Sequence, residues 1–222
     1  MKWLNRLSFS LQRANNKLNS NRLQKKIVIS AAFVSGFCIM AIEMLGARIM
    51  SPYFGGSLSV WGSVLTVFML ALSCGYLIGG RLSEGQPDIK TFAFFFMAAA
   101  LASLPIVFFA DGIMRPIFMA IEDPRYGSLT ASVFLFFMPT TILGMISPYS
   151  IRLLVEHEDH SGKMAGQLFF VSTFGSALGT LGTAFYFVLW FDVNKILLGT
   201  IIALLFVGII IFTFDIAARR SR

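Results

Sequence analysis

Six long apolar runs constrain the fold of this chain more than any other feature. A helix needs about 20 mostly apolar residues to cross the roughly 30 Å hydrocarbon layer of a bilayer, and inside lipid it satisfies its own backbone hydrogen bonds. Runs that reach or approach this length cover residues 27–50, 58–80, 91–110, 129–151, 164–190 and 196–214. The sequence therefore predicts an all-α integral membrane protein with six transmembrane helices.

The composition indicates lipid as the main solvent and leaves little room for an enzyme. Only 13% of the residues are charged, whereas soluble domains carry about 25%. Cys38 and Cys74 lie inside apolar runs, where a thiol behaves as a small hydrophobe, so we expect neither a disulfide nor a metal site. No polar segment exceeds residues 1–26, which is too short for a nucleotide-binding domain. Because the common catalytic motifs are also missing, we expect no enzymatic activity and no cofactor.

The basic residues predict an orientation. Of the 18 Lys and Arg residues, 14 fall on one side of the six spans if the links alternate between the two sides. Because Lys and Arg concentrate on the cytoplasmic side of membrane proteins, both termini are predicted to lie in the cytoplasm. The net charge of +7 is then explained by lipid headgroups, and we expect no nucleic-acid partner.

The first 26 residues are predicted to form a unit distinct from the six-helix domain at 27–222. Apolar residues at helical spacing alternate with basic ones on the opposite face. These are Trp3, Leu4, Leu7 and Leu11 against Lys2, Arg6 and Arg13. The pattern is typical of a short amphipathic helix that lies on the membrane surface and contacts anionic lipids.

Two short similarities raise the possibility of an inverted repeat of three helices. IMSPY at 49–53 resembles ISPYSIR at 146–152, and Gly62 and Gly75 have the same spacing as Gly166 and Gly179. Transporters built from inverted repeats bind their solute where the halves meet. Chance similarity is the alternative.

Small residues cluster in the second and fifth runs. Their motifs include Gly75, Gly79 and Gly80, and Gly175 and Gly179. Such spacings let helix backbones approach closely in lipid, so close helix packing is the favoured interpretation. A narrow passage lined by Gly, Ser and Thr is the alternative.

Glu43 is the ionisable residue that lies most clearly inside a span. A charge at a helix centre costs about 2.5–3.5 kcal/mol on insertion scales, so it needs a partner or water. Arg48 is five residues away, about 140° around a regular helix, so a direct pair would require the helix to unwind near Gly46. Glu43 could lock the bundle, carry a proton or bind a cationic solute, and we favour the structural role.

Three polar or turn-forming segments are interpreted as links. SPYFGGS at 51–57 is barely polar and could dip into the membrane. Residues 111–128 are expected to be an ordinary aqueous link, long enough to cover an outer vestibule or meet a partner. The His157–His160 segment is interpreted as a solvated turn rather than a metal site.

Two blocks of the sequence resemble a known family. The first is Glu43-x-x-Gly46-x-Arg48-x-x-x-Pro52-x-Phe54-Gly55-x-Ser57-x-x-x-Trp61, followed by Gly75-Tyr76-x-x-Gly79-Gly80; the second has Ser147-Pro148, Arg152, Gly166 and Ser172-Thr173-x-Gly175-Ser176-x-x-Gly179. Both are similar to the membrane domain of bacterial spermidine synthase-like integral membrane proteins. The resemblance implies a polytopic fold in a bacterial inner membrane and a polar site at Glu43, Arg48, Pro52, Ser57, Trp61 and Arg152. Members usually carry a fused aminopropyltransferase domain, which we do not expect here.

Two functions follow as hypotheses. The first is a transporter-like module for a small solute, such as a polyamine-like cation, with Glu43 and Arg48 at its outer half-site. The second is a non-transporting anchor or assembly subunit for a separately encoded protein partner, or for copies of itself. A transporter should have a hydrated cavity that reaches Glu43, whereas an anchor should seal Glu43 among its helices.

Overall fold

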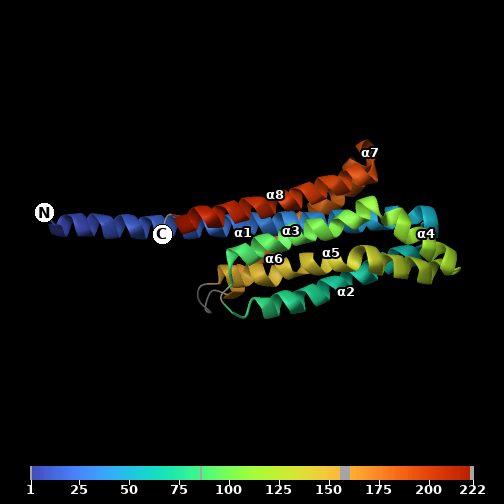
Figure 1. Cartoon of the computed structure of the whole chain (residues 1–222), viewed down its shortest axis with the longest axis horizontal. Coiled ribbons are helices and arrows are strands. Elements are labelled where there is room, and N and C mark those ends of the chain that lie inside the picture. The colour runs from blue at the N-terminus through green and yellow to red at the C-terminus, as the bar shows by residue number, and fades with distance from the viewer. Residues whose placement is uncertain (1, 86, 156–160, 221–222) are drawn as a thin grey trace.

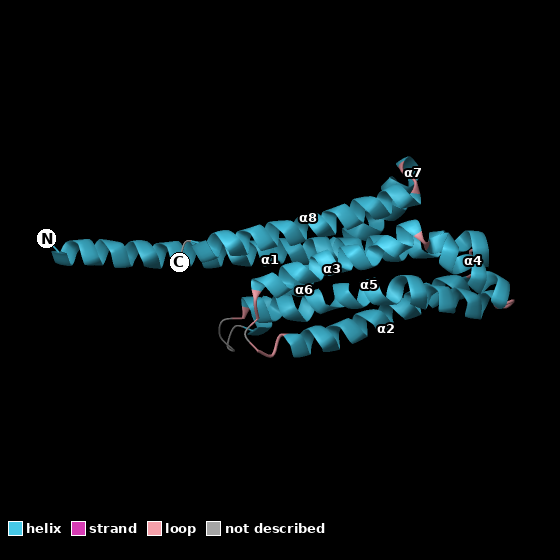
Figure 2. Cartoon of the chain, in the orientation of Figure 1, coloured by secondary structure: helices cyan, strands magenta, loops and turns pink. Residues whose placement is uncertain are grey.

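The computed structural model describes the backbone of residues 2–85, 87–155 and 161–220, and the side chains of residues 22–85, 87–155 and 162–217. Within these ranges the chain is helical and has no strand (Figure 2). The elements are α1 (Lys2–Phe54), α2 (Leu58–Leu82), α3 (Ile89–Phe108), α4 (Ala110–Ala120), α5 (Pro124–Leu154), α6 (Ser161–Leu181), the π-helix η2 (Gly182–Phe187), α7 (Val188–Trp190) and α8 (Val193–Arg220).

The six predicted spans are confirmed as helices of membrane-crossing length and hydropathy. They are Arg22–Phe54, Leu58–Leu82, Ile89–Phe108, Pro124–Leu154, Gly162–Trp190 and Val193–Ala217. The helices form an elongated bundle, and the N- and C-termini lie toward the same end of it (Figure 1). The chain is thus a multi-pass membrane protein in its architecture.

The N-terminal segment continues the first span instead of forming a separate surface helix. Helix α1 runs without a break from Lys2 to Phe54 and extends beyond the bundle along its long axis (Figure 1). The division into two units stays a prediction, but the backbone shows no break near residue 26. The physical reason is that no Gly or Pro occurs before Gly36, so nothing in the sequence ends the helix.

The SPYFGGS stretch forms a helix end and a tight turn, and its expected dip into the membrane stays a prediction. Ser51 to Phe54 are still helical, and α2 begins at Leu58. Gly55 has a φ of 79° and its amide donates to the Ser51 carbonyl at 2.9 Å. This left-handed conformation closes the end of α1, and glycine adopts it without the steric cost of a side chain.

The 111–128 segment is partly a helix, not only an aqueous link. It contains most of α4, which packs against α5 and α1 and buries Met114. Tyr53 donates a hydrogen bond to the Asp111 carboxylate at 3.2 Å, and the Phe118 ring meets the Phe54 ring edge-on at 6.0 Å. These contacts fix α4 across the end of the bundle where α1 turns into α2.

Close backbone contact joins α2 to α5, the most extensive helix pair of the bundle. A Cβ atom on Gly75 would overlap the Thr141 carbonyl oxygen, and one on Gly79 would lie 2.6 Å from the Met145 backbone. From the other side, a Cβ on Gly144 would lie 2.9 Å from the Leu72 carbonyl. The absence of side chains at these glycines therefore sets the distance between the two helices.

The same contact occurs a second time between α6 and α1. A Cβ on Gly175 would overlap the Phe33 carbonyl oxygen, one on Gly179 the Phe37 carbonyl, and one on Gly36 the Ser172 carbonyl. The spacing of Ser172, Gly175 and Gly179 matches that of Leu72, Gly75 and Gly79, and the spacing of the partner positions matches as well. In both pairs, a later residue of one helix contacts a later residue of the other. Helix α2 therefore runs parallel to α5, and α1 runs parallel to α6.

The repeated contact has a different register from the two similarities seen in the sequence. It pairs Gly75 with Gly175, whereas the sequence had suggested Gly75 with Gly179. A Cβ atom added to Gly62, Gly80 or Gly166 would have no other atom within 4 Å, so none of these three glycines sets a helix contact. Tyr149 of the second SPY motif lies at the opposite end of the bundle from Tyr53, where its hydroxyl accepts from the Asp88 amide at 2.9 Å.

Candidate functional site

Glu43 lies inside the bundle on an unbroken stretch of α1. Its side chain is 6% exposed, and no hydrogen bond or ion pair joins it to another described residue. It is not among the residues that line the three described cavities. Glu43 is therefore mostly buried and lies outside these three cavities, although its carboxylate is not among the fully buried side-chain atoms without a partner.

Arg48 points away from Glu43, as the helical spacing predicted. Helix α1 does not unwind near Gly46. This glycine is tightly packed, since a Cβ atom there would lie 3.2 Å from the Phe136 ring. Arg48 is exposed whereas Glu43 is buried, so the two occupy different faces. No ion pair joins them in the described part of the chain.

A cavity of about 390 Å³ lies beside Arg48, where the end of α1, the start of α2 and the π-helix η2 meet. Its lining residues are Met44, Ala47, Arg48, Ser51, Gly56, Trp61, Thr183, Ala184 and Val188. Of the six residues expected to form a polar site, the structure brings two to this cavity, Arg48 and Trp61. Its position between helices from the two halves of the chain is the place where such a site was expected.

Thr183 is one of the residues that line the cavity, and its hydroxyl is buried. The residue is 0% exposed, and its Oγ1 is the one fully buried side-chain polar atom without a hydrogen-bond partner among the described residues. Thr141 and Thr180 show the usual solution, because each donates to the carbonyl four residues earlier, at 2.7 and 3.0 Å. Thr183 stands at the start of η2, where the backbone changes from α- to π-helical geometry, and makes no such bond. An unsatisfied buried hydroxyl is costly, so this position calls for a functional explanation.

The polar groups around the cavity are able to donate hydrogen bonds, and no carboxylate lines it. The Arg48 guanidinium and the Trp61 indole are donors only, and the hydroxyls of Ser51 and Thr183 can donate. The first turn of α2, which begins at Leu58, adds the positive end of its helix dipole. The arrangement can therefore hold a ligand that presents several acceptor atoms or a negative charge.

The other expected site residues lie outside this cavity. Pro52 is exposed within the last turn of α1. Ser57 is the residue before α2, and its hydroxyl lies 2.8 Å from that of Ser59. Arg152 is exposed in the last turn of α5, at the other end of the bundle from Arg48.

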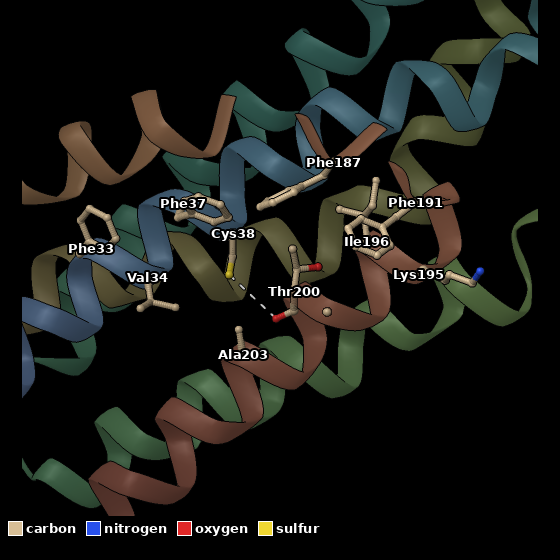
Figure 3. A pocket seen from close by; sticks show the side chains of 11 residues that line it. Phe33, Val34, Phe37, Cys38, Phe187, Phe191, Lys195, Ile196, Thr200 and Ala203 are labelled. Carbon is tan, nitrogen blue, oxygen red and sulfur yellow. Dashed lines mark hydrogen bonds between the residues drawn. The ribbon is translucent and has the colours of Figure 1, made fainter. Parts of the chain in front are cut away.

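A second cavity, of about 490 Å³, lies between α1, η2 and α8 and is almost wholly apolar (Figure 3). Phe33, Phe37 and Phe187 form one side of it, and the Cys38 thiol points toward the Thr200 carbonyl, 3.9 Å away. Lys195 is the charged residue of the lining, and its ammonium pairs with Asp192 at 3.1 Å. This cavity offers carbon surface and no unpaired charge, so it would select ligands by shape.

The described residues offer no group of three or more His, Cys, Asp and Glu that could bind a metal ion. The His157–His160 segment lies outside the described residues. Thr183 was not singled out from the sequence. The one signal near it was the run of small residues from 172 to 183, which had been interpreted as a helix-packing surface.

Comparison with known proteins identifies no relative: no family model, no curated protein and no solved structure matches this chain.

Proposed function

We propose that the chain is a transporter-like module of a membrane, with its solute site in the cavity beside Arg48. The observation that carries this proposal is the composition of that cavity: α1 and α2 from the first half and η2 from the second half bring unpaired donor groups to one open cavity. An inner surface of this kind has no evident purpose in a protein that only packs against lipid and other helices.

The repeated helix contact supports the same proposal. Helices α1 and α2 are joined by a short turn and so run in opposite directions, while α5 runs parallel to α2 and α6 parallel to α1. We infer that the two sets of three helices form an inverted repeat. Inverted repeats allow one half to rock against the other, and their solute sites lie at the junction, often beside an irregular helix segment such as η2.

The solute in this proposal differs from the polyamine-like cation considered from the sequence. A cation site needs carboxylates or carbonyl oxygens, whereas the polar side chains around this cavity are donors and include an arginine. Glu43, the acidic group that had suggested a cation, does not line the cavity. Membership of the spermidine synthase-like family and a place in a bacterial inner membrane remain predictions.

An anchoring or assembly role is the second candidate, and two observations favour it. Only 22% of an apolar 18-residue stretch of the fifth span, Gly162–Trp190, is buried inside the bundle, against 39–50% for the corresponding stretches of the other five spans. This span therefore presents a wide face that a protein partner or a second copy could cover. The low exposure of Glu43 also fits this role.

Two-sided labelling of a single cysteine separates these functions without knowledge of the solute. Ala184→Cys would be introduced into a Cys38→Ala, Cys74→Ala background and treated with a membrane-impermeant maleimide in vesicles of both orientations. A transporter-like module should be labelled at residue 184 from both sides. Gly112→Cys on α4 and Lys163→Cys at the opposite end are controls, each expected to react from one side only. One-sided labelling of Ala184→Cys would favour the anchoring role.

A further inference from the structure

The residues that line the cavity beside Arg48 also indicate which class of ligand it binds. We propose that it binds a phosphate group, either free or as part of a lipid headgroup, through Arg48 and Thr183. This inference rests on the proposed function in one respect, since it takes the same cavity as the solute site. It goes further by assigning the ligand chemistry.

Arg48 supplies the charge for this recognition. Its guanidinium has no ion-pair partner among the described residues, although it lines a cavity in a helix bundle of low polarity. A guanidinium presents N–H donors in a planar fork that fits two oxygens of a phosphate. An unpaired arginine beside a partly enclosed cavity is therefore well suited to an incoming anion.

Thr183 is the independent observation that points to a ligand. Its hydroxyl lacks the bond to a preceding helix carbonyl that Thr141 and Thr180 make, yet the residue is completely buried and belongs to the cavity lining. A bound acceptor oxygen would satisfy it. A phosphate offers several such oxygens, so one ligand could accept from both Arg48 and Thr183.

The remaining lining is consistent with a phosphate group. The Ser51 hydroxyl and the Trp61 indole N–H add donors, and Gly56 lies just before the N-terminus of α2, where the helix dipole favours anions. Trp61 is 36% exposed, as expected for an aromatic side chain at a membrane interface. Such a position is accessible both to a soluble phosphate and to a phospholipid headgroup.

Two measurements on the full chain test the proposal and separate the two sources of phosphate. In a neutral detergent, sodium phosphate should raise the thermal unfolding temperature above that in sodium chloride of equal ionic strength if free phosphate binds. In native mass spectrometry, phosphatidylglycerol should be retained at least tenfold better than diacylglycerol, which lacks the phosphate, if a lipid headgroup binds. Either result in the wild type supports a phosphate site. If the wild type shows neither effect, the proposal is overturned.

Three variants show whether the site is the one proposed. Arg48→Gln and Thr183→Val should each abolish the effect that the wild type shows, whereas Arg115→Gln should keep it. Arg115 is a matched control, because it is exposed on α4 at the same end of the bundle and does not line the cavity. Thr183→Val also shows that a loss of binding is not caused by misfolding. Without ligand, this variant should unfold at the wild-type temperature or higher, because it removes an unsatisfied hydroxyl. Retention of binding in both cavity variants would contradict the proposal.

The outcome is distinct from that of the labelling test. If phosphate and phosphatidylglycerol both fail to bind while Ala184→Cys reacts from both sides, the phosphate assignment is wrong and the transporter-like function stands. If phosphate binds while Ala184→Cys reacts from one side only, the phosphate site stands and the transport function fails.

Discussion

Arg48 and Thr183 line the same cavity, although one belongs to α1 near the start of the chain and the other to η2 near its end. The close contact of α6 with α1 brings them together, because Gly36, Gly175 and Gly179 allow the two backbones to approach. Helix packing and the candidate site are therefore connected: the glycines that hold α6 against α1 also position the π-helix beside Arg48.

Gly75→Ala should destabilise the protein because the added methyl group would overlap the Thr141 carbonyl and push α2 away from α5. A cost of about 1–3 kcal/mol in the free energy of unfolding is expected for overpacking of this kind. Gly80→Ala is the matched control on the same helix, since its Cβ would meet no atom within 4 Å. Unfolding by SDS titration in mixed micelles measures both, and equal effects would argue against the contact.

Gly175→Ala tests the second copy of that contact. The added methyl group would overlap the Phe33 carbonyl, just as a methyl group at residue 75 would overlap the Thr141 carbonyl. A similar loss of about 1–3 kcal/mol in the free energy of unfolding is expected. Gly166→Ala, also on α6 and in open space, should be neutral or stabilising. If Gly175→Ala were harmless while Gly75→Ala was not, the two contacts would not be equivalent.

Tyr149→Phe should weaken the attachment of α3 to α5. The Tyr149 hydroxyl accepts from the Asp88 amide at 2.9 Å and donates to the Asp88 carbonyl at 3.2 Å, and the ring itself is buried against Phe92 and Phe95. The variant keeps the ring and removes both hydrogen bonds, at a cost of about 1–3 kcal/mol in the same unfolding assay. Tyr76→Phe is the control, as Tyr76 is 47% exposed. A loss as large in Tyr76→Phe would show that the assay does not report on these bonds.

Glu43→Gln should leave the free energy of unfolding unchanged or raise it. The glutamine keeps the size and the hydrogen-bonding capacity of the side chain, and no described cation loses a partner. If Glu43 instead formed a buried ion pair, the substitution would cost about 3–5 kcal/mol. SDS titration separates the two outcomes, and the two-sided labelling of Ala184→Cys should be unaffected by Glu43→Gln.

The sequence predicted the helices well and their contacts less well. The apolar runs predicted six spans because the length of a membrane-crossing helix is fixed by the bilayer. Four of the five glycines expected at helix contacts are there, but Gly80 is not, since a run such as GYLIGG does not reveal which of its faces meets a neighbour. The two SPY motifs were misleading as a guide to the repeat, because each belongs to a helix end and the repeated contact lies deeper in the helices.

The site could be predicted only in part. Arg48 and Trp61 stood out as polar or aromatic residues near the end of an apolar run, and both line the cavity. Thr183 did not stand out in the sequence, because its hydroxyl is left unpaired at the π-helical turn. No residue pattern predicts that turn. The separation of Glu43 from Arg48 followed from helical geometry alone, whereas the low exposure of Glu43 depends on neighbouring helices.

The charge of the cavity is the central claim, and reaction rates at Ala184→Cys test it most directly. In the cysteine-free background at low salt, this thiol should react about tenfold faster with a negatively charged methanethiosulfonate than with a positively charged one of similar size. A tenfold ratio corresponds to about 1.4 kcal/mol, a modest value for one cation near a partly enclosed site. Adding Arg48→Gln should remove the preference, and adding Arg115→Gln should not. Equal rates in the parent protein, or faster reaction with the cation, would contradict the account.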